Sequence, residues 1–241
     1  KKFPLSIGLC IKCKNIQTEL GIPMVFYAAL INNYMRKPFP GMFEVHNKNN
    51  KISLKDSFYV GDAWSKTECF SDSDLCFAKN CNLSFYKAEE FFSSNPQIYD
   101  HSYINLFPKV DYELNELNEF IKDKRYLFII SPPASGKSTF CKKYLGEYIR
   151  LSKDDYSTPS KYRKAINKNL GDKLVFDNTN ANRDKILSYL KDSDKIGYII
   201  RNISKEQSFY LNKYRHFITK GSVKLLPDVA IHTYYKRVTF P

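Results

Sequence analysis

Long apolar runs are missing from the 241 residues, and none approaches the ~20 consecutive apolar residues of a membrane-spanning helix. The opening residues 1–7 make a poor signal peptide, because Lys12 and Lys14 soon interrupt their apolar stretch. We therefore expect an intracellular protein with no membrane partner. Its 43% of hydrophobic residues, including 18 Tyr and 18 Phe, are enough for a substantial core.

A second metal-type cysteine pair is also missing. Cys10 and Cys13 have the C-x-x-C spacing of metal ligands, but none of the other four cysteines repeats it. The pattern favours reduced, mostly buried thiols, and a structural zinc is the alternative. Internal repeats and low-complexity linkers are likewise not visible.

Acidic residues are few beside basic ones. The chain has 25 Asp and Glu against 38 Lys and Arg, which gives a net charge of +13. This balance favours an anionic partner. Tyr and Lys are interleaved, which suits a nucleic-acid strand, because aromatic rings stack on bases while cations meet phosphates. A lysine-rich surface without such a partner is the alternative.

The most informative stretch is residues 126–140. Residues 126–130 form a short apolar, β-prone run of the length of a buried parallel strand. Gly136-Lys137-Ser138 then completes most of the phosphate-loop pattern G-x-x-x-x-G-K-[ST]. In this pattern, backbone N–H groups surround phosphate oxygens, the lysine reaches the outer phosphates and the serine hydroxyl can hold Mg²⁺.

The pattern departs from the usual form at its first position, where Ser131 replaces glycine. A Cβ there makes the turn that leaves the strand less permissive. The residues expected to bind the nucleotide phosphates are Ser135, Gly136, Lys137, Ser138 and Thr139.

Strands and helices alternate after this loop, which predicts a parallel, doubly wound sheet. The expected strands are residues 148–151, 174–176 and 196–200, and the expected helices are residues 111–122, 183–190 and 204–217, the last opened by a capping box. Asp177 ends the buried strand at 174–176 in the Walker B arrangement. We place a domain boundary near Phe107-Pro108, which gives units 1–107 and 108–241.

The first unit also reads as α/β. We expect helices at residues 11–20 and after Pro40 and Asp72, and strands at residues 23–30, 57–60 and 83–86. Gly21 suits a helix C-cap. Asp62 follows the strand at 57–60, at the end where open α/β sheets bind ligands.

Several short motifs of this unit give a specific resemblance. They are Gly21-Ile22-Pro23, Arg36-Lys37-Pro38-Phe39-Pro40-Gly41-Met42, Tyr59-Val60-Gly61-Asp62-Ala63, Phe70-Ser71-Asp72-Ser73-Asp74 and Glu89-Glu90-Phe91-Phe92. In this order they resemble the phosphatase domain of polynucleotide kinase 3′-phosphatases, a haloacid-dehalogenase-like, Rossmann-like fold. The resemblance implies that Lys37 balances phosphate charge and that Asp62 binds Mg²⁺, with Asp74 a lesser candidate. From residue type alone, Lys37 would be a solvated lysine and Asp62 a turn former.

The resemblance is partial. The family's nucleophile is the first Asp of an Asp-x-Asp-x-Thr motif, which does not occur in this sequence, and the family's second motif is also missing. We therefore expect that this half either has lost its nucleophile or has been separated from it. A 3′-phosphatase would be active only in a full-length protein that carries the motif.

The second half resembles the same family over nearly its whole length. The matching pieces are the phosphate loop, Ser152-Lys153-Asp154-Asp155-Tyr156, Asp177-Asn178-Thr179-Asn180, Lys213-Tyr214-Arg215, and the ending from Leu226 to Arg237. The resemblance implies a P-loop NTPase-type domain that transfers the γ-phosphate of ATP, with Mg²⁺, to a 5′-hydroxyl end of DNA or RNA.

Individual roles follow from the resemblance together with the chemistry of each side chain. Asp154 is the expected general base, Asp177 is expected near Mg²⁺ beside Ser138, and Arg215 is the expected lid arginine, with Lys213 as its alternative. Asn178 and Asn180 are expected to shape a turn and cap the next helix.

Two other functions remain open at this point. The phosphate loop alone would suit a kinase of a small molecule or nucleotide. The replacement of glycine by Ser131 would suit a module that binds nucleotides or nucleic-acid ends without turnover.

Overall fold

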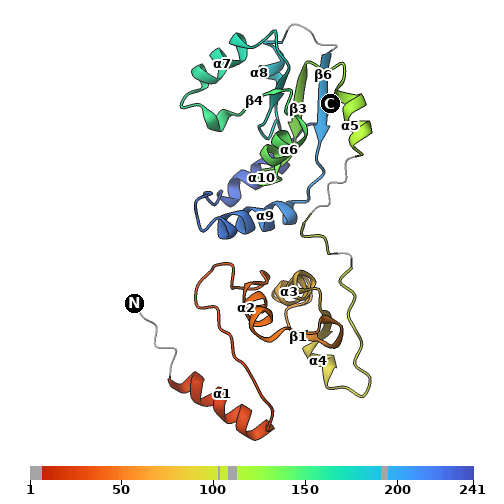
Figure 1. Cartoon of the computed structure of the whole chain (residues 1–241), viewed down its shortest axis with the longest axis vertical. Coiled ribbons are helices and arrows are strands. Elements are labelled where there is room, and N and C mark those ends of the chain that lie inside the picture. The colour runs from red at the N-terminus through yellow and green to blue at the C-terminus, as the bar shows by residue number, and fades with distance from the viewer. Residues whose placement is uncertain (1–6, 103, 108–112, 191–194) are drawn as a thin grey trace. The chain divides into compact units, whose positions relative to one another are not determined.

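The structure, a computed structural model, describes residues 7–102, 104–107, 113–190 and 195–241. The chain divides into two units, Lys1–His101 and Ser102–Pro241, slightly ahead of the expected boundary. Both units are α/β with parallel strands, as the sequence predicts (Figure 1). Within these described ranges, no helix has the length and apolar character needed to cross a membrane.

The second unit is built on one parallel sheet with the strand order β4-β5-β3-β6. Its elements are α5 (Leu114–Ile121), β3 (Tyr126–Ile130), α6 (Lys137–Tyr144), β4 (Ile149–Leu151), η2 (Lys153–Asp155), α7 (Pro159–Lys168), β5 (Leu174–Phe176), α8 (Asp184–Leu187), β6 (Ile196–Ile200), α9 (Lys205–Ile218) and α10 (Asp228–Arg237). Figure 1 shows α9 and α10, in blue, at the carboxyl ends of these strands.

Side chains of β3 alternate between two apolar layers, and helices cover both faces of the sheet. Leu127 and Ile129 pack with residues of α5 and α6. Tyr126 and Phe128 pack on the other face with residues of α7 and α8, and the Phe128 and Phe176 rings stack with centroids 4.6 Å apart. All five β3 residues are buried, which explains why this strand reads as a continuous apolar run.

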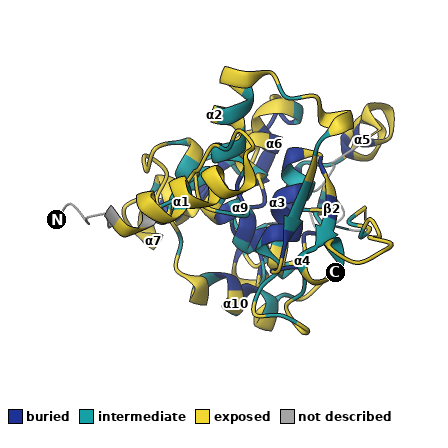
Figure 2. Ribbon diagram, turned by 90° about the horizontal axis from the view of Figure 1, so that it is seen from below, coloured by how far each residue is buried: buried dark blue, intermediate teal, exposed yellow. Residues whose placement is uncertain are grey.

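The first unit holds a two-stranded parallel sheet of β1 (Phe58–Gly61) and β2 (Ser84–Lys87). Its other elements are α1 (Ile7–Leu20), α2 (Gly41–Asn50), η1 (Leu54–Asp56), α3 (Ser73–Cys81) and α4 (Ala88–Phe91). Figure 2 shows α3 largely buried and α1 exposed. Phe77 and Cys81 of α3 pack with Leu83, Phe43 and Tyr59.

Most expected elements are confirmed, with small shifts at their ends. The helix expected at 111–122 is confirmed from Leu114 to Ile121, and its first residues, 111 and 112, lie outside the described residues. The helix expected at 183–190 is short, spanning only Asp184–Leu187. Gly21 ends α1 with a positive φ of 64°, as a C-cap glycine does.

The strand expected at residues 23–30 is wrong. These residues form neither helix nor strand, and Val25 is 61% exposed. A strand needs a neighbour for its backbone hydrogen bonds, and among the described residues β1 and β2 pair with each other. The apolar run therefore indicated a strand, but it did not show whether a neighbouring strand was available to pair with it.

The helix α7 was not expected from the sequence. Thr158 caps it by accepting a hydrogen bond from Lys161 N–H at 3.3 Å, and Pro159 occupies its first position. Tyr162 and Ile166, four residues apart, bury its inner face. A Thr-Pro start followed by this spacing is a helix signal that could have been recognised.

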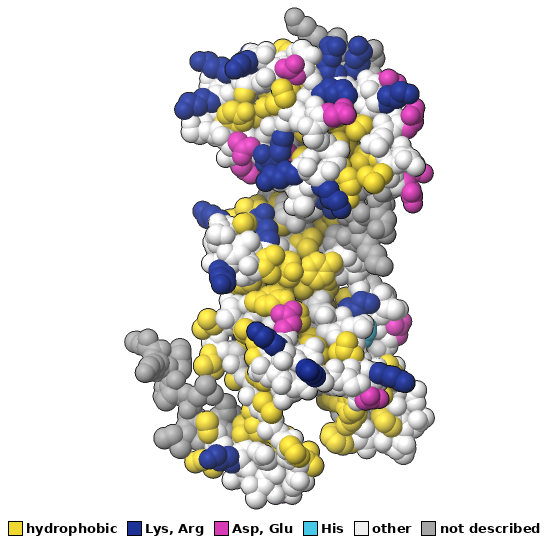
Figure 3. All heavy atoms as spheres, viewed as in Figure 1, with side chains coloured by type: hydrophobic (Ala, Val, Ile, Leu, Met, Phe, Trp, Pro, Cys, Tyr) yellow, Lys and Arg dark blue, Asp and Glu magenta, His cyan; other side chains and the backbone are white. Residues whose placement is uncertain are grey.

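Positive charge is distributed widely. In Figure 3, Lys and Arg side chains are spread over the face that is shown, with Asp and Glu between them. The net charge of +13 therefore does not by itself mark one site. Local geometry has to identify the functional surfaces.

Candidate active-site cleft

The loop after β3 emerges at the carboxyl end of the sheet and leads into α6. Its left-handed positions among the described residues are Ala134, with φ 61°, and Gly136, with φ 80°. A Cβ at Gly136 would meet Arg201 Nη1 at 3.3 Å. The strain expected at Ser131 is not there: Ser131 is fully buried, and its hydroxyl donates to the Arg201 carbonyl at 3.5 Å.

Lys137 opens α6 and folds back over its own loop. Its Nζ donates to the carbonyl of Pro132 at 2.7 Å, to that of Ser131 at 3.3 Å and to the Ser135 hydroxyl at 3.3 Å. Burial lowers the pKa of Lys137 to about 8, although nearby Asp177 opposes the shift. The loop thus holds a partly desolvated cation, which an anion beside it would stabilise.

A cleft of about 620 Å³ opens beside this loop. Its lining consists of residues 133–139 of the loop and α6, of Arg150, Ser152, Asp154, Asp177, Asn178 and Thr179, and of Leu211, Tyr214, Arg215, Ile218, Val223 and Leu226. The five expected phosphate-binding residues therefore lie in one cleft with Asp154, Asp177 and Arg215.

Arg215 reaches the cleft from α9, and its Nη2 donates to Asn212 Oδ1 at 3.2 Å. Burial lowers its pKa, an effect opposed by the charge of Asp154. The helix is tied to the loop because the Ser208 hydroxyl donates to the Pro133 carbonyl at 2.7 Å. Lys213, the alternative lid residue, is exposed and is not part of the cleft lining.

Arg150 is a site residue that sequence reasoning missed. Its Nε donates to Asp177 Oδ2 at 2.6 Å and its Nη1 donates to Asp155 Oδ2 at 2.8 Å. Asp177 is buried, so this bond neutralises a desolvated carboxylate. In the parallel register of β4 and β5, Arg150 lies opposite Val175, two residues before Asp177. The sequence alone does not show that these two strands are neighbours, so it could not predict the Arg150–Asp177 bond.

The two asparagines after β5 do not cap α8, which has Arg183 at its N-cap. They join neighbouring segments of the site by hydrogen bonds. Asn178 Oδ1 accepts from Lys153 N–H at 2.8 Å, and its Nδ2 donates to the Tyr162 hydroxyl at 2.8 Å. Asn180, with φ 49°, donates from Nδ2 to the backbone carbonyls at the ends of β3 and β5. The expected capping role is therefore wrong, and the expected turn-shaping role is confirmed.

The donor set in the cleft fits a hard cation only in part. Ser138 and the second oxygen of Asp177 are oxygen donors of the kind that Mg²⁺ prefers. Within the described part of the chain, no three His, Cys, Asp or Glu side chains form a group able to hold a metal. A cation there would therefore take most of its ligands from phosphate and water.

The first unit holds a separate polar cluster. Lys37 Nζ donates to Asp74 Oδ1 and, at 3.1 Å, to the Tyr59 hydroxyl, while Ala63 N–H donates to Asp74 Oδ2 at 3.1 Å. Asp74 is 2% exposed and Lys37 is 38% exposed. Burial by itself raises the pKa of a carboxyl group, but the bonds from Lys37, Ala63 and Tyr59 lower the pKa of Asp74 overall.

Asp62 does not join this cluster. It follows β1 as expected, but it is exposed, and the structure gives it no hydrogen bond or ion pair within the described residues. Lys37 is therefore placed with Asp74, the lesser candidate, rather than with Asp62. Asp74 can lie close to the backbone of β1 because residue 61 is glycine: a Cβ there would lie 2.6 Å from the Asp74 side chain.

Replacing Lys37 with Met is expected to destabilise the first unit by about 2 kcal/mol, because a buried carboxylate would lose a charged donor. The pKa of Asp74 is below its usual 3.8, so the contribution is present above that value and is lost as pH falls through the folded value. Urea unfolding followed by fluorescence of Trp64, the single tryptophan, measures this change.

The matched control is Lys66→Met, which breaks the pair of an exposed lysine with half-buried Asp72 at 3.2 Å and should cost less than about 1 kcal/mol. Equal losses of unfolding free energy in the two variants would show that the Lys37–Asp74 pair stabilises the unit no more than the Lys66–Asp72 pair does.

Comparison with known proteins is consistent with this geometry. The sequence model of the family described as Polynucleotide kinase 3 phosphatase matches residues 8–92. The Bifunctional polynucleotide phosphatase/kinase of Schizosaccharomyces pombe is 28% identical over 95% of this chain and 59% of its own length. A protein of Acanthamoeba polyphaga mimivirus, provisionally named for the same two activities, is 27% identical over 96% of this chain and 65% of its own length.

A shorter match covers 24% of this chain and 9% of the Polynucleotide 3′-phosphatase ZDP of Arabidopsis thaliana, with 39% identity. The fold and the cleft define an α/β protein with a Gly-Lys-Ser loop at the carboxyl end of a parallel sheet. The chain is thus similar to the polynucleotide kinase 3′-phosphatase family, through the model match in its first unit and through two relatives named for both activities over most of its length. It spans about three-fifths of the length of the first two relatives.

Proposed function

We propose that the second unit is a P-loop kinase domain that transfers the γ-phosphate of ATP to the 5′-hydroxyl end of DNA or RNA. The observation that carries the proposal is the convergence of Lys137, Asp154 and Arg215 on one cleft. These are a phosphate-holding cation, a proton acceptor and a second cation, the set that phosphoryl transfer needs. Over most of this chain, relatives named as polynucleotide phosphatase/kinases match it.

In this mechanism the loop N–H groups and Lys137 hold the phosphates of ATP. Asp154 accepts the proton of the 5′-hydroxyl and orients its oxygen in line with the γ-phosphorus. Arg215 neutralises charge on the transferred group as the bond to the leaving ADP breaks. Mg²⁺ held by Ser138 and Asp177 would supply further neutralisation of phosphate charge.

A transfer assay tests the proposal against its rivals. The protein is given ATP labelled in the γ-phosphate with either a 5′-hydroxyl oligonucleotide or free nucleosides. We expect label on the oligonucleotide, with a 5′-phosphorylated oligonucleotide as a blocked control. Label on nucleosides alone would favour a small-molecule kinase, and ATP binding without any transfer would favour a binding module.

The pH dependence of ATP affinity should report Lys137. The pKa of Lys137 is about 8 in the folded protein, below the 10.5 of the unfolded chain. In the ATP-free protein, the buried ammonium therefore lowers the free energy of unfolding below pH 8, and this free energy rises with pH between about 8 and 10.5. ATP needs the ammonium, so its affinity should fall about tenfold between pH 7 and 9 as the proton is lost. Calorimetric titration at several pH values measures this fall.

Lys137→Met should bind ATP more weakly and with no such fall, because the titrating group is gone. Lys142→Met removes an exposed cation from the same helix and should keep the full pH dependence. A fall that persists in Lys137→Met would assign the titration to another group.

We further propose that the first unit is haloacid-dehalogenase-like and holds a 3′-phosphate through Lys37, with Asp62 on Mg²⁺. This reaction forms an aspartyl-phosphate and needs a carboxylate nucleophile. The printed sequence has no Asp-x-Asp-x-Thr, so the 241 residues alone should not release phosphate from a 3′-phosphorylated oligonucleotide. Robust Mg²⁺-dependent release by this chain, lost in Asp62→Asn, would overturn that expectation.

A further inference from the structure

A short segment at the start of the second unit lies on α9. We call this segment, residues 104–107, the strap; it belongs to the second unit although the sequence predicts a boundary just after it. Gln207, whose side-chain oxygen accepts from Ser204 N–H in the capping box of α9, donates from Nε2 to the Asn105 carbonyl at 2.6 Å. One side chain thus holds both the beginning of α9 and the strap.

Phe107 makes the aromatic contacts of the strap. Its ring meets the Tyr214 ring edge to face with centroids 4.8 Å apart, and the Tyr210 ring in the same way at 5.3 Å. Tyr210 and Tyr214 are in turn stacked, with centroids 6.3 Å apart and an angle of 12° between their planes. These distances are within the range in which aromatic pairs attract each other. The three rings therefore form one cluster that joins the strap to the helix.

This aromatic cluster lies beside the face of α9 that lines the cleft. Gln207, Tyr210 and Tyr214 follow one another at three and four positions, so they share one stripe of the helix. Leu211 and Arg215, four positions apart, belong to the neighbouring stripe and line the cleft. Tyr214 lines the cleft as well, so the ring that Phe107 contacts also forms part of the cleft wall.

Two hydrogen bonds tie α9 to the cleft at other positions. The Ser208 hydroxyl donates to the Pro133 carbonyl at 2.7 Å, and Asn212 Nδ2 donates to the Leu226 carbonyl at 2.9 Å. The strap adds a support at Tyr214, the residue directly before Arg215. The half of the helix that carries the arginine is therefore held from the side of the strap.

We infer that Phe107 is a positioning residue for α9, which by packing on Tyr214 holds Arg215 where the arginine meets the transferred phosphoryl group. The inference rests on the proposed kinase function. Phe107 is not among the described residues that line the cleft, so it acts through the helix and not by touching a substrate. A displacement of about 1 Å in a group that assists the reaction can cost up to about a hundredfold in rate, so the loss of this support should be measurable.

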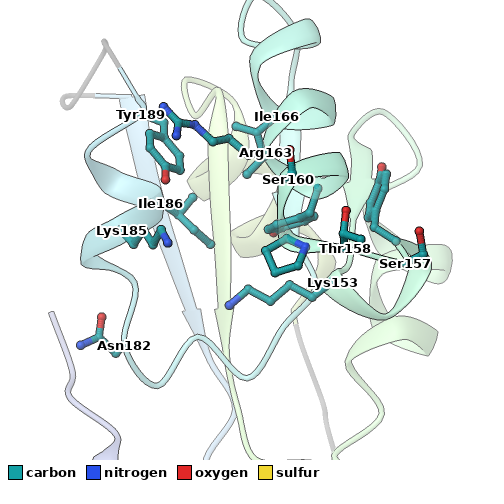
Figure 4. Close-up of a pocket in the computed structure, with 13 residues that line it drawn as sticks. Lys153, Ser157, Thr158, Ser160, Arg163, Ile166, Asn182, Lys185, Ile186 and Tyr189 are labelled. Atoms are coloured by element: carbon teal, nitrogen blue, oxygen red, sulfur yellow. The ribbon is translucent and has the colours of Figure 1, made fainter.

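The strap stands apart from the other cavity of the unit. Figure 4 shows this cavity of about 540 Å³, which α7 and α8 form beside η2, and its described lining contains no residue of the strap or of α9. A substitution at Phe107 leaves those lining side chains unchanged. An effect of Phe107 on transfer would thus be exerted through α9 rather than through that surface.

The test compares Phe107→Ala with Phe120→Ala in the whole chain. Phe120 is a matched control: it is 42% exposed against 44% for Phe107, but it lies beside Gly197 of β6 and is not part of the described cleft lining. Each substitution is made with and without Arg215→Ala. Single-turnover transfer to a 5′-hydroxyl oligonucleotide gives the rate, and amide hydrogen exchange of residues 205–218 without ATP reports how firmly α9 is held.

For Phe107→Ala we expect the rate at saturating ATP to fall about tenfold and the amides of α9 to exchange faster, while Phe120→Ala changes neither. In the Arg215→Ala background, Phe107→Ala should lower the rate less than about twofold, because the group that it positions is already gone. Phe107→Tyr keeps the ring and should restore most of the rate.

A tenfold loss that persists in the Arg215→Ala background, or equal losses in Phe107→Ala and Phe120→Ala, would overturn the inference and leave the kinase proposal intact. A normal rate with normal exchange in Phe107→Ala would overturn it too. If the unaltered protein transferred no phosphate, the kinase proposal would fail separately. Faster exchange of α9 in Phe107→Ala would then still support the hold of the strap on the helix, and unchanged exchange would refute it.

Discussion

Arg215→Ala is expected to lower kcat about a thousandfold, the largest effect of any single change in the cleft. Arginines that neutralise the transferred phosphoryl group in related reactions contribute effects of about this size or larger. Arg215 is placed for that role because it lines the cleft from α9 and lies close enough to Asp154 for their charges to interact. Rapid-quench measurement of a single turnover separates this loss from slow product release.

Lys213→Ala is the matched control, since it removes a cation two positions away on the same helix. Lys213 is exposed and outside the cleft lining, so its loss should change kcat less than about threefold. Arg215→Lys should recover only part of the rate, because an ammonium cannot make the paired contacts of a guanidinium. A large loss in Lys213→Ala with normal activity in Arg215→Ala would reverse the assignment of the two residues.

The fold was predictable where burial alone determines the element. Residues 126–130 and 174–176 are continuous apolar runs because helices cover both faces of the sheet. Such a run is typical of a buried parallel strand, so the sequence predicts these two strands. Residues 23–30 are just as apolar, yet they form no strand, because strand formation depends on a neighbour that the sequence does not show. Local signals decide helices and turns, while pairing is a long-range property.

The candidate site divides in the same way. The loop and its lysine lie in one continuous segment, whose spacing reveals them. The Arg150–Asp177 bond joins residues 27 positions apart, and the Lys37–Asp74 bond joins residues 37 positions apart. Each of these bonds follows from the register of parallel strands or the docking of a loop on a helix. A single sequence therefore named the carboxylates as candidates but could not tell which cation each would meet.

That difference matters for Asp177. The expectation placed this side chain near Mg²⁺, and the structure gives one of its oxygens to Arg150. Arg150 thereby links Asp177 to Asp155, so the buried carboxylate is paired and oriented by a protein cation. Asp154 is outside this network, with its carboxylate facing the cleft. The two acids of η2 thus have different surroundings.

Asp154→Asn is expected to lower the rate of phosphoryl transfer by about 100-fold or more, while ATP binding stays close to normal. The amide keeps the size and shape of the side chain but cannot accept the proton of the 5′-hydroxyl. The loop and Lys137, which hold the phosphates, are untouched by the change. Single-turnover transfer to a 5′-hydroxyl oligonucleotide measures the rate, and calorimetry measures ATP affinity.

Asp155→Asn provides the control from the neighbouring position. This carboxylate is half exposed and pairs with Arg150 rather than facing the cleft, so its loss should cost the rate less than about tenfold. Asp177 would still hold Arg150 in that variant, because the bond at 2.6 Å is retained. Near-normal transfer by Asp154→Asn, or equal losses of rate in the two variants, would show that Asp154 is not the general base. The proton of the 5′-hydroxyl would then have no acceptor among the residues named for this cleft.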